Sequence, residues 1–261
     1  DSAGRGAWRG VALPWGHAVK RLLGWLLDLL YPRDCFFCGR PAGEGGHICT
    51  DCLERLSFHR NPSCSLCGAE SALPEGPDFV CSDCLRKRPS FERAFIVARY
   101  DGAMRDLIQT FKYRRGLWLL EDLTRFLVAT YLARLSPLGL RFDAVVPVPM
   151  QPSKRRSRGF NQAELLAHGL AKQLGLPLRT RLLRRVSTGI LSQTRLRREA
   201  RLRNAAAAYR TAHPRHIRGK TLLLVDDVMT TGATCEVCAR LLRQAGAAKV
   251  YVLALARPLR V

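Results

Sequence analysis

The sequence L-L-L-V-D-D-V-M-T-T-G-A-T, from Leu222 to Thr234, decides how the rest of this chain is interpreted. Its four leading apolar residues show no alternation, which predicts a strand buried on both faces. Asp226 and Asp227 come where that strand is expected to end, and Ala233–Gln244 has helical spacing. A strand, a short turn and a helix N-terminus form an anion site, because unpaired N–H groups and the helix dipole point at one place.

The residue types in this stretch narrow the ligand. Two carboxylates would repel a phosphate, so we expect Asp226 and Asp227 to bind sugar hydroxyls or Mg²⁺ held through water. Threonine hydroxyls add hydrogen-bond donors, and Gly232 lets the backbone approach a ligand closely. A phosphorylated sugar therefore fits best; the alternative is an ordinary βα turn with acids at a solvated strand end.

The same stretch resembles the phosphoribosyl pyrophosphate (PRPP) loop of type I phosphoribosyltransferases. That motif has four apolar residues, two acids, two apolar residues and a small-residue loop, and every position from Leu222 to Thr234 fits it. The resemblance implies that Asp226 and Asp227 contact the ribose hydroxyls of PRPP. It implies a cradle for the 5-phosphate formed by Thr230, Thr231, Gly232, Ala233 and Thr234.

Length and charge set limits on the class of protein. A chain of 261 residues is long enough for one α/β domain and a smaller module. The formal charge is +22, and Arg141–Lys220 holds 19 Lys and Arg against 3 Asp and Glu. Such a field favours polyanions: nucleic acid, diphosphates or an anionic membrane surface. No apolar run reaches the roughly 18 residues that span a bilayer and no signal-peptide cleavage site follows, so we expect a cytoplasmic protein.

Eight of the ten cysteines form four C-x-x-C pairs, a pattern typical of zinc knuckles. Gly39 and Gly68 follow the first and third pairs, where a tight knuckle turn benefits from a positive φ. We expect metal to supply the folding free energy, because this region has few apolar residues. A secreted disulfide module is the alternative. The predicted ligands are Cys35, Cys38, Cys49, Cys52, Cys64, Cys67, Cys81 and Cys84.

Eight thiolates hold one or two structural Zn²⁺ ions, and the pairing is open at this point. Sequential pairing places the first four cysteines on one ion and the last four on the other, and we favour it over crossed pairing. His47 and His59 lie nearby and are expected to be bystanders. The expected organisation is a tail and amphipathic helix over residues 1–31, a double zinc ribbon over 32–88 and a phosphoribosyltransferase-like domain over 89–261.

Strands and helices are expected to alternate after the cysteine pairs, which indicates a parallel sheet flanked by helices. The expected strands are Ala94–Tyr100, Asp143–Met150 and Val250–Ala256, with a strand-turn at Leu182–Leu191; the expected helices are Met104–Tyr113, Trp118–Leu135 and Ala163–Leu174.

Three basic segments accompany these elements. Lys154–Gln162 is expected to be a basic loop at the carboxyl edge of the sheet, where open α/β sheets bind ligands. Ser192–Asn204 is interpreted as a mobile arm or an exposed helix that closes over a ligand. Tyr100-Asp101-Gly102 followed by Phe111-Lys112-Tyr113-Arg114 is interpreted as a basic–aromatic cluster, or else as core aromatics with solvated basic ends.

Several motifs together resemble the ComF family of phosphoribosyltransferase-like proteins, which is linked to competence, the uptake of DNA for natural transformation. These are the four C-x-x-C pairs, V-P-V-P-M at Val146–Met150, R-G-F-N-Q at Arg158–Gln162 and the PRPP loop, with Gln193, Arg201 and Asn204. The resemblance implies a pyrophosphate loop at Val148 and Pro149. It implies pyrophosphate contact or loop closure by Arg158, Gln193, Arg197 and Arg201.

Two functions follow from these observations. The first is transfer of phosphoribosyl from PRPP to an acceptor, with Mg²⁺ and with release of pyrophosphate; Asp226, Asp227 and Arg158 are its candidate catalytic residues. The second is a non-catalytic PRPP-fold protein that binds single-stranded DNA or a competence partner through its zinc ribbon and basic face. Phe111, Tyr113 and Phe160 would then stack on bases. The acceptor and the oligomeric state stay open.

Overall fold

A computed structural model describes residues 33–42, 46–59, 62–71, 76–114, 116–186 and 208–259 of the chain. They fall into two compact units, one ending at Leu53 and the other beginning at Glu54. The first unit contains the helix α2 (Thr50–Leu53) and the first two cysteine pairs. The expected amphipathic helix in residues 1–31 and the Ser192–Asn204 arm lie outside the described residues.

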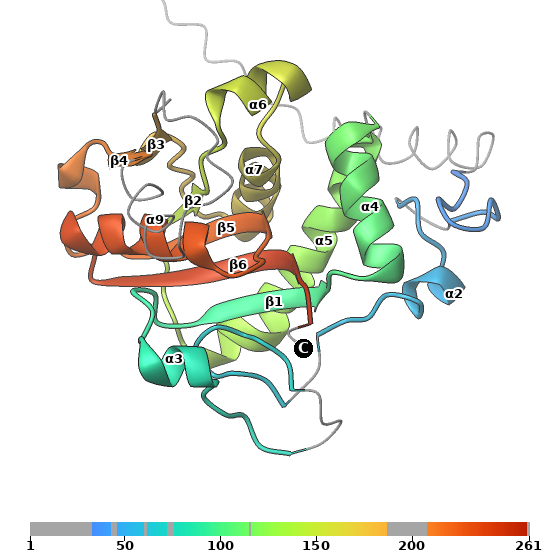
Figure 1. Ribbon diagram of the computed structural model, residues 1–261. Helices are drawn as coiled ribbons and strands as arrows, with labels where there is room; N and C mark the ends of the chain where they lie inside the picture. The colour runs from blue at the N-terminus through green and yellow to red at the C-terminus, as the bar shows by residue number, and fades with distance from the viewer. Residues whose placement is uncertain are drawn as a thin grey trace, which may run out of the picture. The chain divides into compact units, whose positions relative to one another are not determined.

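The second unit is built on a four-stranded parallel sheet of order β1-β6-β5-β2 (Figure 1). The apolar runs of its central strands, Leu222–Val225 of β5 and Val250–Ala256 of β6, are buried as expected, and the predicted parallel sheet is confirmed. Strand β5 extends through both acids rather than ending before them. The strands are β1 (Ala94–Arg99), β2 (Ala144–Pro147), β5 (Thr221–Val228) and β6 (Lys249–Arg257).

Helices cover both faces of this sheet. Helix α9 (Ala233–Gln244) packs against β5 and β6 and lies in front of them in Figure 1. Helices α5 (Leu120–Thr130) and α7 (Gln162–Leu174) pack against the strands from the opposite face. The sheet is therefore the middle layer of the α/β domain that the sequence predicts.

The remaining elements correct two expectations. The expected basic loop at Lys154–Gln162 contains the short helix α6 (Pro152–Arg158), begun by Pro152 and ended by Gly159 with φ +84°. The expected helix at Trp118–Leu135 is α5 with a 3₁₀ turn before it and a π turn after it. The other elements are short or stand apart from the main sheet. Strands β3 (Leu183–Arg185) and β4 (Tyr209–Thr211) pair antiparallel, α3 spans Ser82–Arg86, and α4 spans Gly102–Tyr113. Short 3₁₀ turns lie at Leu117–Leu119, Ser136–Leu138 and Pro214–His216, and the π turn at Tyr131–Leu135. Among the described residues, no helix is both long and apolar enough to span a bilayer.

The third and fourth C-x-x-C pairs, Cys64/Cys67 and Cys81/Cys84, belong to the core of this unit. Cys64 and Cys67 lie in the same buried cluster as Ala94 and Ile96 of β1. The Ala94 N–H donates to the Leu66 carbonyl at 2.8 Å, so this knuckle is hydrogen-bonded to the start of β1. The composition of the cysteine region predicts that metal supplies its folding free energy. The structure corrects this for the third and fourth pairs, because the knuckle also shares the apolar core of the sheet.

Gly68 ends this knuckle and fixes how closely it approaches β1. Its φ is +66°, and an added Cβ would lie 2.7 Å from the Ala94 carbonyl oxygen, which is part of the strand backbone. Gly175 has the same φ of +66° and no atom within 4 Å of an added Cβ. It is therefore a matched control for the cost of the φ angle alone.

We expect Gly68→Ala to lower the free energy of unfolding by about 3 kcal/mol and Gly175→Ala by about 1 kcal/mol. The difference arises because a strand backbone atom has to move to admit the new Cβ. Urea denaturation of the zinc-loaded variants measures both values. Equal losses would show that the knuckle is not packed against β1 at this position.

Candidate functional site

The two acids of the central motif lie in the last part of β5. Asp226 and Asp227 follow Val225, which is fully buried, and are themselves partly accessible. The Asp227 N–H donates to Asp226 Oδ1 at 2.9 Å, and the Val228 N–H donates to Asp227 Oδ1 at 2.6 Å. These bonds hold both carboxylates beside the backbone at the carboxyl edge of the sheet, where a ligand can reach them.

Lys112 pairs with one of these acids. Its Nζ atom lies 2.8 Å from Asp227 Oδ2, and both side chains are about 15% exposed (14% and 15%). Lys112 comes from the last turn of α4, whose residue Phe111 is fully buried. The sequence placed Lys112 only in a basic–aromatic cluster, because nothing in the sequence indicates that α4 ends beside β5.

The surroundings of Asp226 raise its pKa. Burial, followed by the neighbouring charge of Asp227, raises the pKa of Asp226 from 3.8 to about 7. The Asp227 N–H, Lys112 and the Cys235 thiol act in the opposite direction. The Cys235 thiol donates to Asp226 Oδ2 at 3.7 Å. Cys235 and Cys238 on α9 are both buried. Because one lysine pairs with one of the two carboxylates, a bound cation or hydroxyl donors could compensate the charge of the other.

The loop from Met229 to Gly232 connects β5 to α9. The Met229 N–H donates to the Ala256 carbonyl at 2.9 Å, which ties the start of the loop to β6. Gly232 has φ +78° at the position before α9, and an added Cβ would lie 2.7 Å from the Met229 methyl carbon. The Ala233 N–H donates to Thr231 Oγ1 at 3.3 Å. The first turn of α9 therefore begins where the sequence predicts an anion cradle.

The predicted pyrophosphate loop lies next to the acids. The Val148 N–H donates to the Val225 carbonyl at 2.9 Å, one residue before Asp226. The buried Asn161 amide donates from Nδ2 to the Val148 carbonyl at 3.1 Å. Asn161 thus fixes the backbone at Val148, a role that the sequence did not reveal.

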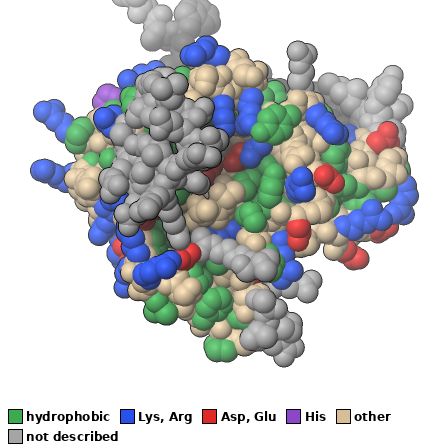
Figure 2. All heavy atoms as spheres, viewed as in Figure 1, with side chains coloured by type: hydrophobic (Ala, Val, Ile, Leu, Met, Phe, Trp, Pro, Cys, Tyr) green, Lys and Arg blue, Asp and Glu red, His purple; other side chains and the backbone are tan. Residues whose placement is uncertain are grey.

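Arg158 ends α6 and reaches α4. Its Nη2 atom donates to Tyr113 Oη at 2.5 Å, and its guanidinium carbon lies 4.4 Å from the centre of the Tyr113 ring. Arg158 is therefore held beside the residue that follows Lys112. Figure 2 shows Lys and Arg side chains around α6. Arg184 of β3 and Arg210 of β4 are exposed as well. The candidate closing residues Gln193, Arg197 and Arg201 lie outside the described residues.

The cysteines form two separate clusters. Cys35, Cys38, Cys49 and Cys52 form one, and Cys64, Cys67, Cys81 and Cys84 form the other; within each cluster all four sulfurs lie within 4.8 Å of one another. Sequential pairing is therefore confirmed. In both clusters one sulfur–sulfur distance is 3.7 Å, close to the roughly 3.8 Å edge of a tetrahedral zinc–thiolate site. Each cluster fits one Zn²⁺ ion.

The knuckle backbones are also arranged for metal-bound sulfur. Gly39 and Gly68 have φ values of +69° and +66°, as predicted. Cys64 Sγ accepts from the N–H groups of Cys67 and Cys81 at 3.4 Å each. Hydrogen bonding from the Cys67 side chain and these N–H groups lowers the pKa of Cys64 to about 4, against the opposing effect of burial. These bonds favour the thiolate form of Cys64, whereas the hydrogen bond to Cys64 raises the pKa of Cys67.

The raised pKa of Asp226 predicts a pH-dependent cost in stability. The folded state holds the proton more tightly than the unfolded state, so stability falls as pH rises from about 4 to about 7 and is level above that. Asp226→Asn removes this cost. The free energy of unfolding of the variant, relative to that of wild type, is expected to increase by on the order of 2 kcal/mol from pH 5 to pH 8, after allowance for partial exposure.

Urea denaturation of both proteins across that pH range measures the difference. Contributions from the zinc thiolates are common to both proteins and cancel. A difference that is the same at pH 5 and pH 8 would contradict the raised pKa.

Comparison with known protein families matches both parts of the chain. Residues 26–85 match the double zinc ribbon domain, and residues 161–260 match the phosphoribosyl transferase domain. The first match contains both cysteine clusters, and the second contains β5, the loop and α9. The zinc ribbon and the phosphoribosyltransferase-like fold are thus supported by sequence similarity as well as by geometry.

Similar whole proteins carry names linked to DNA. The DNA utilization protein YhgH of Salmonella typhimurium is 34% identical over 88% of this chain and 100% of its own length. Competence protein F of Haemophilus influenzae is 32% identical over 80% of this chain and 90% of its own length. Competence protein ComFC of Bacillus subtilis is 25% identical over 89% of this chain and 93% of its own length. With this extent of similarity, the chain belongs to the ComF family of competence and DNA utilization proteins, which combine a double zinc ribbon with a phosphoribosyltransferase-like domain.

Proposed function

We propose that the chain binds PRPP with Mg²⁺ at the carboxyl end of β5 and transfers its phosphoribosyl group to an acceptor. The observation that carries this proposal is the position of Asp226 and Asp227 directly before a glycine turn and the first turn of α9. Sugar hydroxyls donate to carboxylates, while phosphate oxygens accept from N–H and hydroxyl groups. A phosphorylated ribose offers both chemistries in one ligand.

The charge at the acids supports a ligand that includes a cation. Lys112 balances one of the two carboxylates, and the pKa of Asp226 is raised to about 7 chiefly by burial and next by the charge of Asp227. Hydroxyl groups of ribose, or water molecules on Mg²⁺, would stabilise the second carboxylate as an anion. In this proposal, Thr230, Thr231, Ala233 and Thr234 hold the 5-phosphate through backbone and hydroxyl groups.

The proposed transfer breaks the bond between the anomeric carbon and the pyrophosphate oxygen. The bonding electron pair leaves with pyrophosphate, and the acceptor then forms the new bond to the anomeric carbon. The chain contributes by positioning and by placing cations near the leaving group. Arg158 and the backbone at Val148 and Pro149 are our candidates for that contact, and Gln193, Arg197 and Arg201 for closure over it.

The cysteine chemistry bears on location. Eight thiols arranged as two zinc sites need a reducing compartment, because disulfide formation would compete with metal binding. We therefore propose that the protein acts in the cytoplasm.

We expect the double variant Asp226→Asn/Asp227→Asn to raise the dissociation constant for PRPP at least about tenfold, since neutral amides hold Mg²⁺ more weakly than carboxylates and cannot balance the charge of Lys112. Isothermal calorimetry with PRPP and Mg²⁺ measures this loss. Asp143→Asn is the matched control, because Asp143 pairs with Lys220 at 2.9 Å before the opposite end of β5. Equal binding by the double variant would disprove the site assignment. Pyrophosphate release with a panel of bases and amines then tests transfer.

A second function, binding of single-stranded DNA, is favoured by the basic surface of α6, β3 and β4. Lys154, Arg155 and Arg156 are exposed on α6. Tyr113 is 67% exposed and could stack on a base. Phe111 cannot, because it is fully buried, and this corrects the expectation from the sequence. The names of the family members make DNA a reasonable partner for the same protein.

We expect the affinity for single-stranded oligonucleotides to fall steeply with salt, by a slope of about 0.7 for each phosphate contact. Replacing Lys154, Arg155 and Arg156 with Gln should reduce that slope by about 2. Fluorescence anisotropy over a salt series measures it. The control variant Arg125→Gln/Lys172→Gln changes charge on helices α5 and α7. An unchanged slope in the α6 variant would exclude this surface from DNA binding.

A further inference from the structure

Arg257 is a buried cation at the end of β6. Its side chain is only 4% exposed, and its Nη1 atom donates to the Cys67 carbonyl of the second metal knuckle. Arg257 belongs to the central strand next to β5, whereas Cys67 lies 190 residues earlier in the chain. A strand of the α/β domain therefore places a guanidinium directly against a metal-binding loop.

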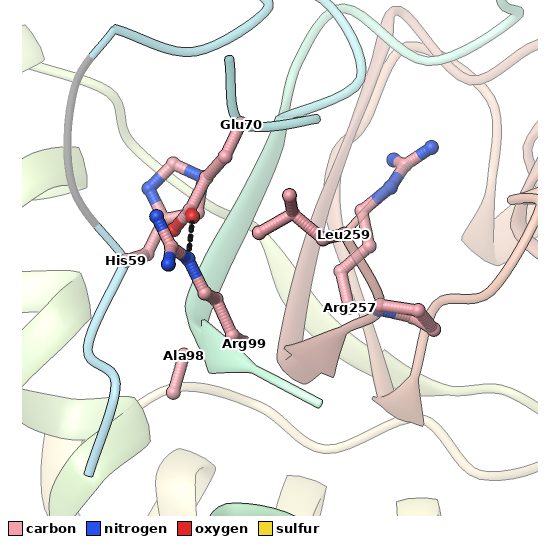
Figure 3. Close-up of a pocket in the computed structure, with 7 residues that line it drawn as sticks. His59, Glu70, Ala98, Arg99, Arg257 and Leu259 are labelled. Carbon is pink, nitrogen blue, oxygen red and sulfur yellow. Dashed lines mark hydrogen bonds and ion pairs between the residues drawn. The ribbon is translucent and has the colours of Figure 1, made fainter. Parts of the chain in front are cut away.

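Among the described residues, no carboxylate forms an ion pair or a hydrogen bond with this guanidinium. The Nε and Nη2 atoms of Arg257 are buried without a hydrogen-bond partner in the described part of the chain. Figure 3 shows the small pocket that Arg257 lines with Glu70 and Arg99. There Glu70 bonds to Arg99, while the Arg257 guanidinium points away from both. A buried and unpaired cation is costly unless a nearby negative charge compensates it.

The second cysteine cluster supplies that negative charge when it holds zinc. Four thiolates on one Zn²⁺ carry a net charge of −2, and three of these four cysteines are buried. The first cluster differs, because Cys38 is exposed and water can screen its charge. The buried centre therefore needs a counter-charge from the protein, and Arg257 is the cation bonded to its knuckle.

The knuckle itself is held by three consecutive carbonyl groups. Leu66 accepts from the Ala94 N–H at 2.8 Å, Cys67 accepts from Arg257, and the Gly68 oxygen lies 3.0 Å from His59 Nε2. Arg257 makes the middle contact of the three. It contributes a guanidinium, whereas the other two partners are a backbone N–H group and an imidazole. It therefore orients the loop that presents Cys64 and Cys67.

We propose that Arg257 is the positioning residue and counter-charge of the second zinc centre, so that stable zinc binding there requires a cation at the end of β6. The donor set of that centre fits zinc by its sulfur spacing and its N–H to sulfur bonds. Residues that support metal ligands in this way typically contribute about 10- to 100-fold to metal affinity.

The test measures zinc affinity of the second centre alone. Full-length protein carrying Cys38→Ser and Cys49→Ser has only that centre, and competition with a chromophoric chelator gives its dissociation constant. We expect Arg257→Met to weaken zinc binding by about 10- to 100-fold and Arg257→Lys to restore most of the loss. Cobalt(II) in place of zinc reports tetrahedral thiolate coordination through its absorption bands. PRPP is absent throughout, so the outcome is independent of the proposed transferase site.

Arg99→Met is the matched control, because Arg99 lines the same pocket but bonds to Glu70. It should change zinc affinity by less than about threefold. An unchanged affinity in Arg257→Met, or equal losses in the Met and Lys variants, would overturn the proposal. Should Arg257→Met fail to fold, Arg257→Gln and Arg257→Lys are compared by the zinc concentration at which half of each protein refolds. Equal concentrations would overturn the proposal.

Discussion

Strand β5 is hydrogen-bonded on both sides, and this constraint positions the rest of the α/β domain. A buried strand has to satisfy its backbone groups on both edges, so β2 and β6 flank β5 in parallel register. Two further bonds extend the pairing past the strand ends: Val148 donates to Val225, and Met229 donates to Ala256. The predicted pyrophosphate loop therefore lies beside Val225, one residue before Asp226, and the predicted phosphate loop begins just after β5 ends.

The carboxyl edge of the sheet carries two unbalanced charges of opposite sign. Asp226 and Asp227 share one lysine, so the acids have an excess negative charge on β5. Arg257 has no carboxylate partner in the part of the chain that the structure describes, so β6 ends in an excess positive charge there. Both imbalances are costly in a buried setting. In our proposals, binding relieves both of them: a cation or sugar hydroxyls at the acids, and a zinc–thiolate centre at the arginine.

The local parts of this arrangement could be predicted from the sequence, and the long-range parts could not. The apolar run Leu222–Val225, the helix Ala233–Gln244 and the cysteine spacings each depend on neighbouring residues, and the structure has all three. Lys112, Asn161 and Arg257 depend on which distant elements meet. No periodicity or spacing relates α4 to β5, or β6 to a knuckle 190 residues earlier. A short helix begun by proline was also mistaken for a loop at α6, because its side chains are almost all polar or basic.

The two zinc centres have different physical settings despite the same C-x-x-C spacing. The described structure divides after Leu53, so the first centre belongs to a separate unit, in which the described residues bury only Cys35, Ile48 and Cys52 as apolar side chains. Metal binding has to supply much of the folding free energy there. The second centre lies in the unit with the sheet and shares its core, where Cys64 and Cys67 pack with Ile96 and α9. Its metal is then one contributor among hydrophobic packing, three held carbonyl groups and a buried cation. Two ribbons of equal appearance in sequence are therefore unequal in how strongly the domain depends on their zinc.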